Sequence, residues 1–307
     1  MTSLAKALMR DWRPITGEIT TLNVEDGNLR LLSVVGKKVR RWGSLPLELG
    51  LSREGLILDR DRVGAGISAL FTFQKASKRK VVTSLSGLGA LHRTLNLPRM
   101  DRRLLKNVVM REARRVLPSS PEQLYLSWQI IGQNTTGFQV YLLGVPRNLL
   151  EGHIKALQAA RVRATAMDLK PLALARAINR SEAIIANLES ECLDIIIVVN
   201  YIPVIMRAIP LGEESPKPAD KFHRLMEEME QTIGFYDDSH QDSQLPPNTP
   251  AYLTGGLVNL PIPPNIKEGI ETRIKYPLAI PEPPLEYPPE LPLSRYMVNL
   301  GLALKKV

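Results

Sequence analysis

A tight turn at Asp26-Gly27 is the first place in the sequence where residue types and spacing could support chemistry. The turn lies within TLNVEDGNLRLL, residues 21–32, between two runs rich in apolar residues. Asp-Gly at such a reversal predicts a β-hairpin. Because glycine lets backbone N–H groups approach a phosphate closely, a hairpin of this kind can hold a nucleotide. The turn is therefore a candidate phosphate site.

The other residue types that could do chemistry form no recognised catalytic or metal-binding motif. The four histidines are far apart in the sequence, and none has a metal-ligand spacing such as HExxH. The sequence also lacks a GxSxG elbow, a Walker loop and a GxGxxG loop. Cys192, the single cysteine, borders an apolar run and is expected to be a small buried residue rather than a nucleophile. We therefore expect no catalytic residue and no metal site.

Composition indicates a folded protein with a basic first third. Of the 307 residues, 44% are hydrophobic, enough for two domains or one two-lobed unit. Residues 1–120 contain 23 Lys and Arg against 10 Asp and Glu, whereas the remainder contains 17 against 21. This asymmetry suggests contact with an acidic surface, whether lipid headgroups, nucleic acid or an acidic protein. The alternative is a surface that is simply rich in lysine and arginine and has no such partner. The most apolar run, residues 193–211, is interrupted by charged residues and a proline, so it predicts two buried strands rather than a membrane span.

The first 85 residues divide into a leader and a strand-rich unit. Residues 1–16 place apolar residues at four-residue spacing between basic ones, which predicts a leader that is disordered or amphipathic. Residues 17–85 predict three consecutive antiparallel strands, a helix over residues 60–74 and a further buried strand.

Residues 86–165 predict a compact inserted α+β subdomain in the order strand, helix, strand, strand, helix. Its first helix, over residues 101–117, can be capped by Asp101 and stopped by Pro118. One face of this helix is apolar: Leu104, Leu105, Val108, Val109, Ala113 and Val116. The exposed side is basic and is a candidate lipid or partner face, with a solvated helix face as the alternative. Its residues are Arg102, Arg103, Lys106, Arg111, Arg114 and Arg115.

The second half repeats the three-strand pattern of the first. Residues 183–211 predict another meander, and a helix over residues 220–236 follows. Residues 277–292 hold seven prolines, which predict an extended segment rather than a helix. The chain is expected to close with a helix that has Gly301 at a close packing point.

Four stretches, in this order and spacing, resemble the PilM family of actin-like proteins of type IV pilus assembly. They are residues 81–131, MDLKPLALARAI at 167–178, YLTGG at 252–256 and NLGLAL at 299–304. The resemblance covers nearly the whole chain. It implies an α/β, actin and Hsp70-like (ribonuclease H-like) fold, with two related lobes around a cleft and a small inserted α+β subdomain. Residues 17–85 would form part of the first lobe, residues 86–165 the insert, and residues 166–307 the rest of the first lobe and the second lobe.

The resemblance also implies two phosphate-binding hairpins, which read Asp-Ile-Gly in the family. Placed on this sequence they fall at Asn23-Val24-Glu25 and Asn187-Leu188-Glu189. Asparagine loses the charge that favours Mg²⁺, and glutamate puts a negative side chain where a phosphate would sit. Both hairpins are therefore expected to be degenerate.

Four further positions complete the remnant nucleotide site that the resemblance implies. Gly27 belongs to the first hairpin, and Thr254-Gly255-Gly256 matches the turn that contacts adenosine in relatives. The two glycines of that turn can equally serve packing. We expect no cofactor, or ATP with Mg²⁺ if the family activity is retained.

The function that the resemblance implies is that of a cytoplasmic scaffold at the inner face of the cell membrane. It would bind the cytoplasmic tail of a single-span pilus-assembly protein in a groove beside the inserted subdomain, with a possible second contact to the anionic membrane surface. Degenerate hairpins would make it a pseudo-ATPase, and the single cysteine fits a reducing compartment. An active actin-like ATPase of pilus, secretion or cell-division machinery is the alternative. Nucleic-acid binding is a third hypothesis, although the basic third has few aromatic residues for base stacking.

Overall fold

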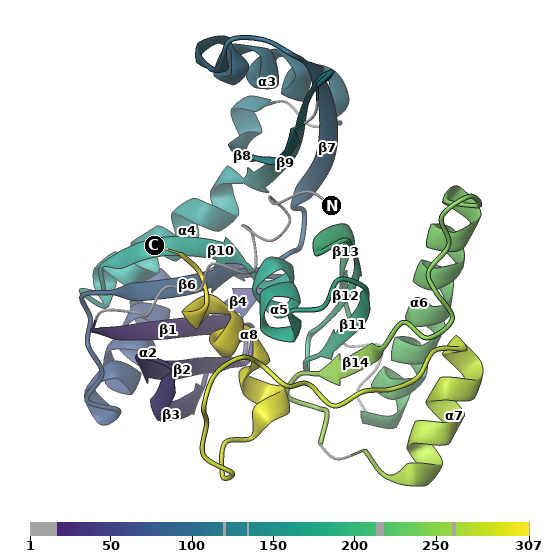
Figure 1. Ribbon diagram of the computed structural model, residues 1–307. Helices are drawn as coiled ribbons and strands as arrows, with labels where there is room; N and C mark the ends of the chain where they lie inside the picture. The colour runs from purple at the N-terminus through teal and green to yellow at the C-terminus, as the bar shows by residue number, and fades with distance from the viewer. Residues whose placement is uncertain (1–16, 119–120, 134, 213–217, 260–261, 307) are drawn as a thin grey trace.

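Two lobes flank a pair of central helices in this protein, and a third unit projects from the first lobe (Figure 1). The computed structural model describes residues 17–118, 121–133, 135–212, 218–259 and 262–306. The predicted leader, residues 1–16, lies outside these ranges. Within them, no helix is both long enough and apolar enough to cross a membrane.

The first lobe is a five-stranded sheet in the order β10-β6-β1-β2-β3. The predicted meander is confirmed as antiparallel β1 (Glu18–Glu25), β2 (Asn28–Val35) and β3 (Lys38–Pro46). Two strands in parallel with β1, β6 (Val81–Leu85) and β10 (Ala164–Leu169), extend it. One element was not predicted, a short ribbon of β4 (Ser52–Arg53) and β5 (Leu56–Ile57). Helices α2 (Arg60–Phe73) and α4 (Arg147–Ala159) cover the outer face of the sheet.

The second lobe repeats this plan with the sheet order β13-β12-β11-β14. Its antiparallel meander is β11 (Ala183–Leu188), β12 (Cys192–Val199) and β13 (Ile202–Pro210), and β14 (Ala251–Thr254) runs parallel to β11. Helices α6 (Pro218–Ser239) and α7 (Pro264–Ile274) cover its outer face. The internal repeat is therefore confirmed, whereas α7 was not predicted.

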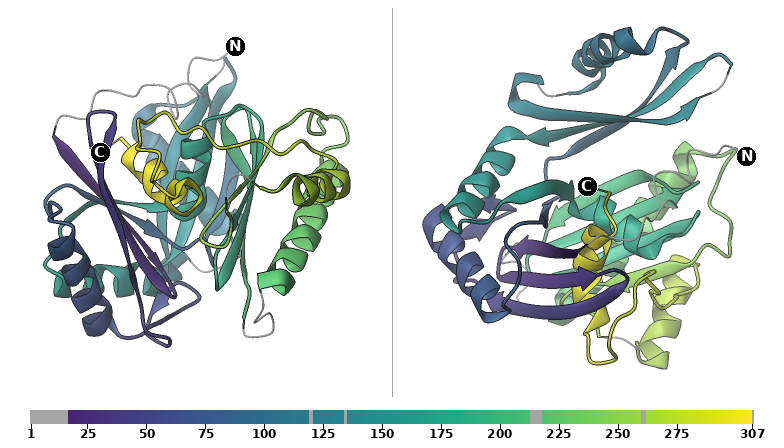
Figure 2. Two further views of the ribbon diagram at one scale, coloured as in Figure 1. Left: turned by 90° about the horizontal axis from the view of Figure 1, so that it is seen from below. Right: turned by 60° about the vertical axis from the view of Figure 1, so that its left-hand side comes forward.

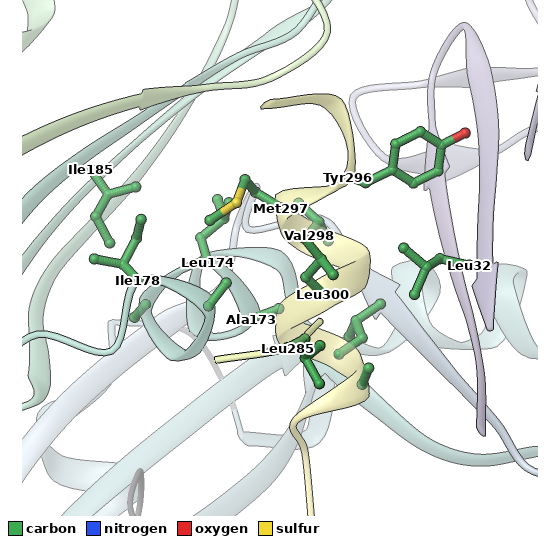
Figure 3. Close-up of a cluster of buried hydrophobic side chains, with 14 of the residues drawn as sticks. Leu32, Ala173, Leu174, Ile178, Ile185, Leu285, Tyr296, Met297, Val298 and Leu300 are labelled. Carbon is green, nitrogen blue, oxygen red and sulfur yellow. The ribbon is translucent and has the colours of Figure 1, made fainter. Parts of the chain in front are cut away.

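Two helices lie between the sheets, α5 (Lys170–Ile178) and α8 (Leu293–Ala303) (Figure 2). Their side chains share one core with the inner faces of both sheets, including Leu32 of β2 and Ile185 of β11 (Figure 3). A Cβ atom on Gly301 would lie 1.8 Å from the carbonyl oxygen of Ala173, so the predicted close packing point is confirmed. The proline-rich segment before α8 contains no helix, and its Glu286 pairs with the edge of β3 through Val39.

The inserted unit is a three-stranded antiparallel sheet in the order β7-β9-β8 with one helix on it. Its elements are β7 (Leu91–Pro98), α3 (Arg102–Val116), the 3₁₀ turn η1 (Pro121–Gln123), β8 (Leu124–Gln133) and β9 (Gly137–Pro146). Asp101 caps α3 as predicted, because its side chain accepts a hydrogen bond from the Arg103 N–H at 2.9 Å. The prediction for Leu104 was wrong, since this side chain is 55% exposed and does not join the apolar face.

The helix that we expected to close the insert packs on the first lobe instead. Ala156 and Leu157 of α4 belong to the outer core of that lobe. Gly64 of α2 permits the contact, since a Cβ there would lie 2.6 Å from the Cβ of Ala159. Helical periodicity shows that a helix has an apolar face, but it does not show which sheet that face covers.

Candidate functional site

The eight predicted remnant positions of the nucleotide site lie together where the two lobes face each other. Asn187 and Thr254 are neighbours on adjacent strands of the second lobe. Gly27 approaches the second hairpin, because a Cβ on it would lie 3.7 Å from the Oγ of Ser190. A cavity of about 230 Å³ lies between the lobes and is lined in part by Gly27, Glu189 and Gly256. The structure therefore brings the two predicted hairpins and the Gly-Gly turn into one interlobe cleft.

A buried ion pair joins the lobes across this cleft. The two terminal nitrogens of the Arg30 guanidinium, on β2, donate to the two carboxylate oxygens of Glu189, each at 2.7 Å. The two side chains are only 7% and 5% exposed. This two-point geometry fixes the direction as well as the distance between the partners. Glu189 therefore binds the opposite lobe at the position where the family places a glycine.

A second cation, Lys170 at the start of α5, bridges two more carboxylates. Its Nζ lies 3.1 Å from Oε2 of Glu25 and 3.0 Å from Oδ2 of Asp194. Each of these carboxylates is also held by an asparagine of the remnant site. Asn23 donates to Glu25 at 2.9 Å, and Asn187 donates to Asp194 at 3.1 Å.

We refer to Arg30, Lys170, Glu25, Glu189 and Asp194 as the interlobe ion network. Burial alone would lower the pKa of Lys170, but Asp194 and Glu25 raise this pKa well above its ordinary value. Burial would raise the pKa of Glu25, yet Lys170 and Arg30 together bring it below the ordinary value. Burial and the charge of Glu25 raise the pKa of Glu189. With three carboxylates for two cations, the network offers no surplus positive charge to an incoming anion.

The retained glycines have structural reasons in this arrangement. A Cβ on Gly256 would lie 2.6 Å from both Arg30 Nη2 and Glu189 Oε2, so the ion pair itself requires a residue without a side chain there. Gly255 has φ of +107°, a conformation that favours glycine. The geometry therefore supports the alternative that Gly255 and Gly256 serve packing and backbone conformation rather than contact with adenosine.

The residues in the cleft do not fit a magnesium polyphosphate. Glu25 and Glu189 place carboxylates at the two hairpins, where a phosphate needs backbone N–H groups and positive potential. Among the residues that the structure describes, no three His, Cys, Asp or Glu side chains are grouped so that they could hold a metal ion.

Sequence reasoning missed three members of the network: Arg30, Lys170 and Asp194. Arg30 and Asp194 each place a charge inside an apolar strand, NLRLLSVV and CLDIIIVV. A charge at such a position predicts a buried partner, because an isolated buried charge is strongly unfavourable. That signal was present, but the identity of each partner depends on the tertiary fold.

A separate groove lies between the inserted sheet and the lobes, with a cavity volume of about 290 Å³. Its walls come from β8, β9, β10, α5 and the turn before β13. The lining is largely apolar: Tyr125, Trp128, Ile131, Tyr141, Leu143, Val145, Met167 and Leu172 contribute to it. One end carries charge, where Asp168 pairs with Arg176 at 2.8 Å and Lys305 at 3.2 Å.

None of the four histidines lines the groove or the interlobe cavity, and neither does Cys192. The imidazole of His153 is buried against Thr83 at 3.0 Å, and burial lowers its pKa to about 4. His92 stacks on Tyr141 and lies 3.1 Å from the Val204 carbonyl oxygen of the second lobe, and the other two histidines lie on or beside α6. Cys192 is buried, as predicted. The six basic residues of α3 are exposed on the inserted unit, away from the interlobe cleft (Figure 1).

Similarity to known proteins is found by comparing structures and not by comparing sequences. No protein-family model matches the chain, and no curated protein sequence matches it. A chain of the solved PilM-PilN type IV pilus biogenesis complex superposes with a TM-score of 0.76 at 20% identity, covering 94% of this chain and 98% of that one.

Two further solved structures are similar with lower scores. The ethanolamine utilization protein EutJ from Carboxydothermus hydrogenoformans gives a TM-score of 0.54 at 11% identity, covering 97% of this chain and 94% of its own. The cytoplasmic domain of EpsL, an inner membrane component of the type II secretion system of Vibrio cholerae, gives 0.52 at 13% identity, covering 95% and 97%. The chain therefore has the predicted two-lobed actin-like fold, in a form that matches a chain of the PilM-PilN complex over nearly its whole length.

Proposed function

We propose that this protein is a cytoplasmic scaffold of type IV pilus assembly that binds the cytoplasmic tail of a single-span membrane protein at the inner face of the membrane. The observation that carries the proposal is the apolar groove beside the inserted sheet, in a fold similar to a chain of the PilM-PilN complex. A scaffold needs a surface for a partner rather than a reactive centre, and the groove provides one.

The groove suits a short extended peptide. β8 is the outer strand of its sheet, so its free edge can pair with a further strand. Three consecutive residues of β8, Ser127, Trp128 and Gln129, line the cavity. Neighbouring side chains of a strand point to opposite faces of the sheet, so one face alone could not supply three consecutive lining residues. We infer that the free edge of β8 borders the groove. A volume of about 290 Å³ leaves room for a few apolar side chains rather than a large cofactor.

The scaffold acts without ATP turnover in this proposal. Support comes from the interlobe ion network, which occupies both hairpins with carboxylates and sets three carboxylates against two cations. The alternative is an active ATPase of pilus, secretion or cell-division machinery, and the retained Thr254-Gly255-Gly256 turn is the observation in its favour.

Tyr125→Asp tests the groove directly. The Tyr125 side chain lines the cavity and is 53% exposed, so the substitution should preserve folding and weaken binding of an apolar peptide. We expect at least about a tenfold loss of affinity, as is usual for an aromatic anchor. The measurement is fluorescence anisotropy with a labelled synthetic peptide of the cytoplasmic tail of the single-span pilus-assembly protein encoded by the same host.

Phe235→Asp on α6 is the matched control, because Phe235 is a 66% exposed aromatic residue outside the groove lining. It should leave peptide affinity unchanged. Equal affinities for the wild-type protein and Tyr125→Asp, or no binding by the wild-type protein, would count against the groove as the partner site.

A further inference from the structure

We propose that the exposed face of α3 docks on an anionic lipid surface while the groove holds the partner tail. The inference rests on the proposed function, because that function brings the chain to a membrane. The proposal gives the protein a second contact surface. This surface lies on α3, which contributes no residue to the lining of the groove or of the interlobe cavity.

Positive charge is concentrated in the first lobe and in the segment that contains α3. Residues 86–165 hold 12 Lys and Arg against 4 Asp and Glu, a surplus of 8, and residues 1–85 hold 15 against 8, a surplus of 7. Residues 166–307 hold 13 against 19 and are acidic overall. The field around the chain is therefore uneven and would turn the first lobe and the insert, rather than the second lobe, toward an anionic surface.

The cations of α3 are available to such a surface. All six side chains are exposed: Arg102, Arg103, Lys106, Arg111, Arg114 and Arg115. Arg115 pairs with Glu112 at 3.7 Å, and Arg102 donates to Gln133 at 3.3 Å. Among the described residues, no carboxylate forms an ion pair with the other four. Most of the charge on this face is thus left for an external partner.

The same face carries an apolar side chain, which favours lipid over nucleic acid. Leu104 is 55% exposed and lies seven residues, or about two turns, before Arg111 on one side of the helix. An exposed leucine among cations is typical of helices that lie in a membrane interface, where the leucine enters the acyl boundary. By contrast, α3 has no aromatic residue on which a base could stack.

The position of α3 allows both contacts at once. α3 lies at the end of the inserted unit, distant from the second lobe (Figure 1 and the right-hand view of Figure 2). It covers the face of β9 that presents Val140 and Leu142, whereas Tyr141 and Leu143 line the groove. Alternate residues of a strand point to opposite faces, so α3 and the groove use opposite faces of one sheet.

The test is cosedimentation of the full chain with vesicles that contain about 30% phosphatidylserine in phosphatidylcholine, at about 50 mM salt. We expect the wild-type protein to bind these vesicles, and to release them at about 0.5 M salt, because surface charge is then screened. The triple variant Arg103→Glu, Lys106→Glu, Arg114→Glu should lose at least about tenfold in affinity, since each cation near such a surface contributes roughly fivefold.

The matched control reverses three exposed charges of the first lobe: Arg40→Glu, Arg60→Glu and Lys75→Glu. It changes the net charge equally and should retain most vesicle binding. The inference is overturned if both triple variants bind the vesicles equally, if the wild-type protein does not bind anionic vesicles, or if it binds duplex DNA but not the vesicles.

Binding of the groove peptide is a separate measurement that tests the proposed function. The α3 variant should bind it normally, whereas failure of the wild-type protein to bind it would count against the proposed function alone.

Discussion

Replacing Arg30 with methionine is expected to lower the free energy of unfolding by about 3–5 kcal/mol. The substitution removes both hydrogen bonds to Glu189 and leaves a carboxylate that is 5% exposed without its cation. It also removes one of two cations that face three carboxylates in the interlobe ion network. Urea denaturation followed by circular dichroism measures the change.

An exposed ion pair of the same lobe supplies the control. Arg41 pairs with Glu18 at 2.6 Å, but the two side chains are 43% and 24% exposed. Arg41→Met should therefore cost less than about 1 kcal/mol. Adding Glu189→Leu to Arg30→Met should restore much of the lost stability, because the carboxylate that lost its cation is then removed as well. Equal small losses for Arg30→Met and Arg41→Met would contradict the importance of the interlobe pair.

Gly301→Ala is expected to lower the free energy of unfolding by about 1–3 kcal/mol. A Cβ at this position would lie 1.8 Å from the Ala173 oxygen, 2.5 Å from its carbonyl carbon and 3.0 Å from its Cα. All three atoms belong to the backbone, so α5 and α8 must move apart to admit one methyl group. Both helices belong to the core that joins the two sheets, and the loss should therefore appear in global unfolding.

Gly269→Ala on α7 is the matched control. Nothing lies within 4 Å of a Cβ at Gly269, and the residue is inside a helix. Alanine there should stabilise the protein by up to about 1 kcal/mol, because it has the higher helix propensity. A Gly301→Ala protein as stable as the wild-type protein would contradict the close backbone contact between α5 and α8.

The two meanders and the basic helix could be predicted because their signals are local. Turn residues at Asp26-Gly27 and Gly36-Lys37 mark the reversals of the first meander, and helical spacing with a capping Asp101 marks α3. Seven prolines exclude a helix from residues 277–292. The PilM resemblance then supplied the arrangement of these elements, which local patterns do not contain.

The parts that could not be predicted depend on contacts distant in sequence. Arg30 and Glu189 are 159 residues apart, and Lys170 reaches Glu25 across 145. No local pattern connects such partners. The placement of α4 failed for the same reason, since its apolar face fits either the insert or the first lobe until the fold is known.

The prediction of degenerate hairpins rested on the same two kinds of substitution in each hairpin. Asparagine stands in place of aspartate and glutamate in place of glycine, and each change weakens the binding of a magnesium-bound phosphate. The structure supplies a physical role for both glutamates, because Glu25 and Glu189 each bind a buried cation from another element. Stability that a bound nucleotide would otherwise provide between the lobes can come from these ion pairs. In the proposed scaffold, these ion pairs hold the two lobes together without a nucleotide.

Thermal unfolding of the full chain with and without about 5 mM Mg-ATP tests this claim most directly, because a ligand that binds only the folded state must stabilise it. Binding with a dissociation constant a hundredfold below that concentration would add about 2.7 kcal/mol. We expect the unfolding midpoint to stay unchanged. A rise of about 4 °C or more would contradict a scaffold whose two hairpins are occupied by the interlobe ion network.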